Sequence, residues 1–460
     1  MSYLTLIVVL GTSLLGCVSG VVGGFAVLRR RALSGDLLAH AALPGICLAF
    51  LVLGGRHLLG MLAGALLTGL AGIALIAILA RWTRTKDDAA LGIVLSTFFG
   101  AGVMLSSLIQ NMPDGGSKAG LETYIYGQAA GMVRSDVYLI AAVSAAALLV
   151  VGLLYKEFKL LSFDPGFARA QGWPTLVLDV AMMGTLALVT VVGLPAVGVV
   201  LMAAMLILPA AAARFWTDRL GRMLVLSGVL GAVTGSVGSL LSAGVLRQWI
   251  GFDPFRFGAG ADLPTGPVIV LCGTAVFLCS ALFAPRRGVV ARALGALRLR
   301  ARTAEENLLR TVFEHTEPHL PQSVVVPVAE LLRHRAWGRS RATWLVQKAQ
   351  RRGLLRRQAD GVQLTPQGIA EARRLVRVHR LWELFLIHGA AIAPDHVDRD
   401  ADSIEHVLSP QIIAELERRF AAELAATAGE VPGSPHELEE PPAPLSRAPR
   451  AAWSRERGRG

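Results

Sequence analysis

Long apolar blocks separated by short polar breaks fill the first 285 residues of the chain. Most blocks reach the roughly 20 residues that cross a bilayer as a helix. From Pro285 onward the pattern becomes charged and is typical of a soluble region. It therefore predicts an all-α polytopic membrane domain of about nine transmembrane helices, followed by a soluble part. The nine blocks cover residues 4–28, 36–54, 58–80, 89–109, 137–154, 175–193, 196–213, 222–246 and 266–284.

The soluble part changes between helical and strand periodicity. Residues 305–315, 326–333 and 339–353 have the apolar spacing of three helices, and residues 354–365 alternate like a hairpin with Asp360 and Gly361 at its tip. Three helices and a hairpin are typical of an α+β winged helix-turn-helix. The chain then divides into a membrane domain (1–285), a basic juxtamembrane linker (286–302), a winged-helix domain (303–370), a helical domain (371–424) and a disordered Pro-rich tail (425–460).

The chain has 45 Lys and Arg against 33 Asp and Glu, a formal net charge of +12. Basic residues collect on the cytoplasmic loops of membrane proteins, so this excess does not by itself indicate nucleic-acid binding. The basic clusters between the blocks can all be cytoplasmic if the N-terminus lies outside and the C-terminus inside. We therefore expect a multi-pass protein of the cytoplasmic (inner) membrane in that orientation.

Asp36 and His40 are polar residues near the start of an apolar block. They are four residues apart, so they share one face of a helix. Ionisable residues inside a membrane are costly and mark ion pathways. A carboxylate with an imidazole suits manganese, zinc or ferrous iron. Pro44 frees a backbone carbonyl nearby, as is common at transport sites.

An alternative is that Asp36 only caps the helix and His40 is a packed interfacial residue. For two other acidic residues near block ends, Asp136 and Asp179, capping is the favoured role. A GxxxxGK[ST] phosphate loop does not occur, so we do not expect this chain to be an enzyme that hydrolyses ATP.

The third predicted helix of the soluble part is basic. Arg339, Arg341 and Lys348 could contact DNA if this helix enters a major groove. The alternative is a protein-binding winged helix with a solvated basic face. Further along, Asp402, Glu405 and His406 share a helical face, and such oxygen and nitrogen ligands suit manganese or ferrous iron better than structural zinc.

Four motifs in the membrane part resemble one family, the permease subunits of ABC-type manganese, zinc and iron importers. They are 27–30 (VLRR) with 35–45 (GDLLAHAALPG), 124–127 (YIYG), 162–172 (SFDPGFARAQG) and 198–213. The resemblance implies that Asp36 and His40 coordinate metal during passage. It also implies partners: ATPase subunits, an extracytoplasmic metal-binding lipoprotein and a second permease copy, the same or different. The segment that would couple to the ATPase contains Phe163, Asp164, Pro165, Ala168 and Gly172.

Residues 303–420 resemble the iron- and manganese-dependent repressor family, including its DNA-binding part and its metal-binding and dimerisation part. The similar stretches are 364–368 (LTPQG), 378–386 (VHRLWELFL) and 401–409 (ADSIEHVLS). The resemblance implies a divalent metal cofactor, with Mn²⁺ or Fe²⁺ favoured and Zn²⁺ also compatible. Where several members carry a ligand on the first helix, this chain has Leu309. The matched ligand positions are His379, Glu383, Asp402, Glu405, His406 and Glu306, with Asp398 near another.

Two functional hypotheses follow. The first is a metal importer permease that carries a cytoplasmic metal-sensing domain, which regulates transport. The alternative is a membrane-tethered, metal-dependent transcriptional regulator. A third, weaker hypothesis is that the soluble part only dimerises.

Overall fold

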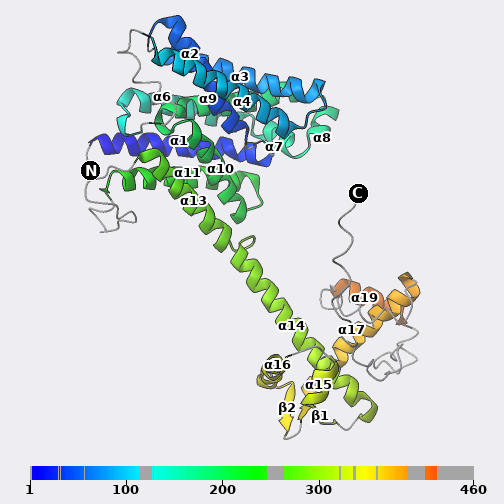
Figure 1. Ribbon diagram of the computed structural model, residues 1–460. Helices are drawn as coiled ribbons and strands as arrows, with labels where there is room; N and C mark the ends of the chain where they lie inside the picture. The colour runs from blue at the N-terminus through cyan, green and yellow to red at the C-terminus, as the bar shows by residue number, and fades with distance from the viewer. Residues whose placement is uncertain are drawn as a thin grey trace, which may run out of the picture. The chain divides into compact units, whose positions relative to one another are not determined.

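The computed structural model divides into two units, Met1–Ala293 and Leu294–Gly460, which are described separately (Figure 1). The residues that the structure describes are 3–29, 31, 33–55, 57–112, 127, 129–245, 264–320, 323–334, 338–358, 361–390 and 410–421.

The first unit is helical, as its apolar blocks predicted. Among the described residues, eight helices are long and apolar enough to cross a membrane, where nine spans were expected. The seventh block, residues 196–213, forms α10, whose apolar part, Leu201–Trp216, is shorter than the spans of the other eight blocks. The long helices are α1 (Tyr3–Leu28), α2 (Ser34–Leu53), α3 (Leu58–Trp82), α4 (Asp87–Gln110), α6 (Arg134–Leu153), α9 (Thr175–Val197), α10 (Val199–Trp216), α11 (Leu220–Ser242) and α13 (Thr265–Phe283). Shorter elements are η2 (Ala129–Gly131), α7 (Tyr155–Phe163) and α8 (Pro165–Ala170).

The break between the sixth and seventh blocks, which the block bounds put between residues 193 and 196, is at Gly198. Pro195 lies inside α9, and the chain reverses at Gly198 with a φ of 91°, which only glycine adopts without strain. Gly127, at the end of the YIYG motif, packs against this turn. A Cβ there would lie 2.2 Å from the carbonyl carbon of Val197. The other three residues of that motif lie outside the described residues.

Small residues allow the membrane helices to approach closely. A Cβ on Gly16 of α1 would lie 2.2 Å from the carbonyl oxygen of Gly231 in α11, and one on Gly45 of α2 would lie 2.1 Å from that of Gly64 in α3. Such contacts drive helix association in lipid, where the hydrophobic effect is absent. Figure 1 shows α2, α3 and α4 side by side, while α1 packs against α10 and α11.

The second unit contains the predicted winged helix. Its sheet has the order β1-β3-β2, with both pairs antiparallel. The expected hairpin is confirmed, although Asp360 at its tip lies outside the described residues. The helix expected from residue 326 begins at Val328, because Val326 and Pro327 pair with β3 instead. The elements are α14 (Val289–Thr316), η3 (Glu317–His319), β1 (Val326–Pro327), α15 (Val328–His334), α16 (Arg339–Arg351), β2 (Leu355–Gln358), β3 (Gly361–Leu364), α17 (Pro366–Ala390) and α19 (Pro410–Arg419).

The core of the second unit joins α14 to the winged helix. Leu308 and Val312 of α14 are fully buried with Leu345 of α16 and Val362 of β3. The basic linker and the first predicted soluble helix are therefore parts of one continuous helix, α14.

Candidate metal pathway and cytoplasmic sites

Asp36 and His40 lie in the first two turns of α2. The Asp36 Oδ1 atom is 3.5 Å from His40 Nε2, which is longer than an ordinary hydrogen bond. The His40 ring lies edge-on to Phe99 of α4, with 4.9 Å between the ring centroids. The Nδ1 atom of His40 is buried and has no hydrogen-bond partner among the described residues. The pair therefore offers a carboxylate and an imidazole whose lone pairs are not all engaged.

The start of α2 does not support the capping role that the alternative gave to Asp36, whereas the His40–Phe99 contact is compatible with its packed histidine. The N-cap residue of α2 is Leu33, and among the described residues no side-chain hydrogen bond caps this helix, so Asp36 is not the cap that the alternative assumed. Pro44 has no N–H to donate to the carbonyl of His40, four residues before it. Leu37, Leu38 and Ala39 are completely buried, which fixes the helix that carries the pair.

The two other membrane-end acids have different roles. Asp136 accepts a hydrogen bond from the Val133 N–H at 3.0 Å and caps α6, as predicted. Asp179 was expected to be a cap as well, but its carboxylate is ion-paired with Arg29 and Arg31, which follow α1. Burial lowers the pKa of the Arg29 guanidinium, and the Asp179 carboxylate opposes this shift. Local sequence patterns could not predict this ion pair, because Arg29 and Asp179 are 150 residues apart.

The predicted coupling segment is a helical corner with an exposed apolar surface. Asp164 caps α8 by accepting a hydrogen bond from the Phe167 N–H at 2.8 Å, and Pro165 occupies the first turn. Ala168 is buried and anchors α8, whereas 61% of Phe163 and 50% of Phe167 are exposed. Gly172 ends the segment with a φ of 80°.

Only part of the predicted cytoplasmic metal site is described. On α17, His379 Nε2 lies 3.1 Å from Glu383 Oε1, and both side chains are almost completely buried. Glu306 is instead ion-paired with Arg302 at 2.7 Å, and this hydrogen bond raises the pKa of Arg302. Within the described ranges, no group of three or more His, Cys, Asp and Glu is placed to hold a metal ion. Four predicted positions lie outside those ranges: Asp398, Asp402, Glu405 and His406.

The described part of the site contains a residue that the sequence did not suggest, Arg310 of α14. Its Nη1 atom lies 2.9 Å from Nδ1 of His379. Leu309, at the position where several repressors carry a ligand and this chain does not, is a buried core residue.

The predicted DNA-contacting residues are not equivalent. Arg339 and Arg341 are exposed on α16. The Lys348 ammonium instead lies 2.9 Å from Oε2 of the buried Glu305 and 5.4 Å from the ring centre of Trp344. Arg352 binds the other oxygen of Glu305, also at 2.9 Å. Lys348 is therefore engaged in an ion pair within the protein, although its side chain is 34% exposed.

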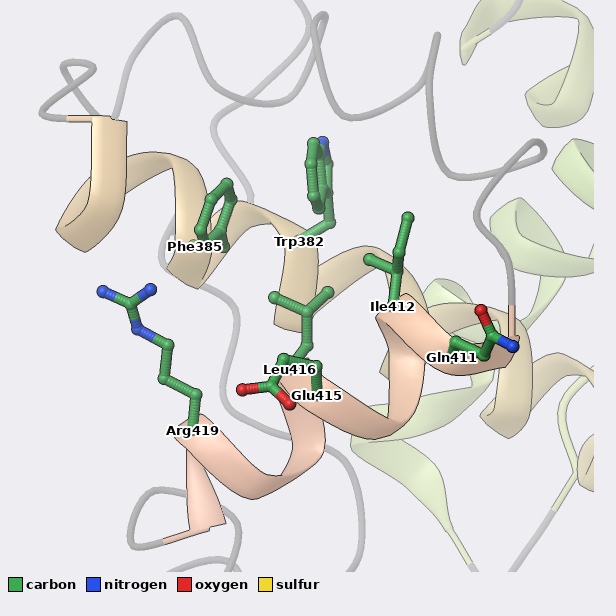
Figure 2. Close-up of a pocket in the computed structure, with 7 residues that line it drawn as sticks. All are labelled: Trp382, Phe385, Gln411, Ile412, Glu415, Leu416 and Arg419. Carbon is green, nitrogen blue, oxygen red and sulfur yellow. The ribbon is translucent and has the colours of Figure 1, made fainter.

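An apolar groove lies between α17 and α19, as Figure 2 shows. Its volume is about 380 Å³. Trp382 and Phe385 are stacked with 5.0 Å between their centroids, and the Arg419 guanidinium lies 5.7 Å from the Phe385 ring centre. The sequence interpretation missed this groove, although its apolar residues recur at helical spacing on both helices. The lining residues are Trp382, Phe385, Gln411, Ile412, Glu415, Leu416 and Arg419.

Known proteins resemble the chain in both parts. Residues 1–284 match the ABC 3 transport family, and residues 365–422 match the iron dependent repressor, metal binding and dimerisation domain. The manganese transport system membrane protein MntC of Bacillus subtilis is 39% identical over 394 residues, covering 85% of this chain and 86% of the relative. The zinc transport system membrane protein TroC of Treponema pallidum is 43% identical over 283 residues, covering 62% and 90%.

A solved structure supports the fold of the membrane unit. It is PsaBC from Streptococcus pneumoniae in complex with Fab, which is 29% identical and superposes with a TM-score of 0.51. The match covers 62% of this chain and 94% of that one. The chain therefore belongs to the ABC 3 transport family of membrane permeases and carries a C-terminal domain of the iron-dependent repressor type.

Proposed function

We propose that this chain is the permease subunit of an ATP-binding-cassette importer that moves a divalent metal ion across the cytoplasmic membrane. The substrate would be manganese, iron or zinc. The observation that carries the proposal is the Asp36–His40 pair, which combines a carboxylate and an imidazole on one face of an otherwise apolar, buried helix. The names of the relatives MntC and TroC, for manganese and zinc systems, point to the same class of substrate.

The pair is suited to passage more than to storage. Two protein ligands hold a divalent ion weakly, because closed metal sites use four or more. A transport site must bind strongly enough to admit the ion and weakly enough to release it. The carbonyl oxygen of His40, which Pro44 leaves without its usual backbone donor, would supply a third ligand.

The energy for transport would come from a separate ATPase subunit. Phe163 and Phe167 expose aromatic surface around the capped helix α8, and such a surface can dock in a groove of a partner. We place α8 and the second unit in the cytoplasm, with the N-terminus outside. The complete importer would contain two ATPase subunits, a second permease copy and an extracytoplasmic metal-binding lipoprotein.

The second unit would sense metal on the cytoplasmic side. Binding of Mn²⁺ or Fe²⁺ by Asp402, Glu405 and His406, with Glu306, would change the rate of uptake, which couples two distinct sites. In this way imported metal would regulate its own entry.

Transport can be tested in proteoliposomes that contain the chain, its ATPase and its binding protein. We expect Asp36→Asn and His40→Gln each to lower manganese uptake roughly tenfold or more, as the loss of one of few ligands implies. The matched controls are Asp88→Asn, an exposed acid near the start of α4, and His57→Gln, an exposed histidine before α3. If Asp36→Asn and His40→Gln transport like the wild type, the pathway assignment is wrong.

The sensor proposal is tested in the same proteoliposomes with a chain truncated after Pro285. If the uptake rate of the truncated chain responds to internal manganese as that of the full chain does, the sensor proposal fails.

The second candidate function is a membrane-tethered transcriptional regulator. The exposure of Arg339 and Arg341 on α16 of the winged helix favours it. The test is metal-dependent binding of the full chain, in nanodiscs, to DNA over a range of salt concentrations. Affinity that falls with salt and is lost in an Arg339→Ala, Arg341→Ala double variant would support this function.

A further inference from the structure

Arg310, His379 and Glu383 form a buried cluster between α14 and α17. The Nη1 atom of Arg310 lies 2.9 Å from His379 Nδ1 and 3.3 Å from Nε2, so Nδ1 is the nearer ring nitrogen. The Nε2 atom also lies 3.1 Å from Glu383 Oε1. Only 6% of the Arg310 side chain is exposed, and still less of the other two. On its other side, Arg310 Nε is 3.0 Å from Glu314 Oε1.

The hydrogen bonds among these three groups determine which ring nitrogen of His379 carries the proton. A guanidinium only donates, and an ionised carboxylate only accepts. Nδ1 of His379 must therefore accept from Arg310, while Nε2 carries the proton and donates to Glu383. The ring is neutral, and both of its nitrogens are used. The Arg310 guanidinium contacts the carboxylate of Glu314 directly and that of Glu383 through the imidazole.

This arrangement does not fit a metal ion at the pair. A metal would need a lone pair on Nε2, at about 2.0–2.1 Å. The ring proton would then move to Nδ1, where it would point at an N–H of Arg310, and two donors would face each other. A divalent ion at Nε2 would also lie close to the guanidinium, and charges of like sign repel strongly away from water. The buried Leu309, at a position where repressors carry a ligand by resemblance, offers no alternative donor.

We propose that the His379–Glu383 pair is held by the Arg310 guanidinium as its resident cation and does not bind metal. The cluster then joins α14 to α17 without metal. This removes His379 and Glu383 from the ligands of the proposed sensor. Occupancy of the pair does not depend on transport by the membrane unit.

The wild-type chain provides the first test. The full chain, labelled with ¹⁵N only in its ten histidines, is placed in nanodiscs and titrated with Zn²⁺ alone. The His379 signals are identified by their loss in His379→Gln. We expect an unprotonated Nδ1 and a protonated Nε2, both unshifted at saturating Zn²⁺, while signals of other histidines move. A Zn²⁺-induced shift of the His379 signals, or a protonated Nδ1, would overturn the proposal.

The second test removes the cation. Full-length Arg310→Met is heated in EDTA, and the folded fraction of residues 294–460 is measured by pulse proteolysis. Loss of a buried charge partner predicts a midpoint on the order of 10 °C below that of the wild type. The matched control is Arg302→Met. Arg302 is also on α14 and pairs with a glutamate four residues later, Glu306, but its side chain is 71% exposed. We expect the control to change the midpoint little. If Arg310→Met melts like the control, the guanidinium does not hold the cluster and the proposal is wrong.

Discussion

The carboxylate of Asp179 in α9 is ion-paired with the guanidinium of Arg29, the residue that follows α1. Arg31 donates to the other carboxylate oxygen at 3.0 Å. One acid thus ties the ends of two membrane helices together, just before the chain enters the helix of Asp36 and His40. Ionic hydrogen bonds of this kind, partly shielded from water, are stronger than exposed pairs.

Replacing this acid tests how much the contact stabilises the membrane unit. We expect Asp179→Asn to lower its free energy of unfolding by on the order of 1–3 kcal/mol, because two arginines lose their counter-charge. The measurement is the thermal midpoint of the purified chain in detergent. Asp218→Asn is the control, because its pair with Arg287 is about half exposed. Equal effects of the two substitutions would show that Asp179 is only a surface pair.

Gly127 supports the turn between α9 and α10. We expect Gly127→Ala to destabilise the membrane unit by more than the about 1–2 kcal/mol that a left-handed conformation costs an alanine, because the new Cβ would collide with the backbone of Val197. Gly54→Ala measures the conformational cost alone. Gly54 has a φ of 66°, but a methyl group added there would meet no atom within 4 Å. Both variants are compared by thermal unfolding. A Gly127→Ala chain as stable as Gly54→Ala would exclude close packing at this turn.

The corner at α8 gives a prediction about the ATPase. Phe163→Ala removes an aromatic side chain that is 61% exposed, so it should weaken binding of the ATPase subunit while leaving the fold intact. Affinity is measured between the purified chain and the ATPase, with melting recorded in parallel. Leu176→Ala, which shortens an exposed residue of α9, serves as the control. Unchanged affinity in Phe163→Ala would move the docking surface elsewhere.

Glu305 organises the winged helix from inside. Its side chain is 3% exposed and binds both Lys348 and Arg352, so Glu305→Gln should lower the stability of the second unit by about 2–4 kcal/mol. Glu415→Gln, in an exposed pair with Arg418, should cost less than about 1 kcal/mol. The readout is resistance of residues 294–460 to pulse proteolysis. Similar losses in the two variants would contradict a buried role for Glu305.

Much of the architecture could be predicted from local patterns. Apolar blocks of bilayer length became helices, and the spacing of Asp36 and His40 placed them together because a helix brings residues four apart onto one face. Asp164 and Pro165 begin α8 through contacts within one turn. The exact turn between α9 and α10 could not be predicted, because Pro195 can lie inside a helix when its neighbours pack around it.

The sequence by itself therefore determined the division into membrane and soluble parts, the polar pair in α2 and the winged-helix pattern. Each of these depends on residues that are neighbours within one turn of a helix or within one strand. Only the tertiary structure decided which charges meet. Arg310 reaches His379 across 69 positions of sequence, and Arg352 reaches Glu305 across 47. The physical reason is that a buried charge needs a partner from whatever element packs beside it, and periodicity does not reveal that neighbour. For the pair on α17, resemblance predicted a metal, but the packing of α14 supplied an arginine.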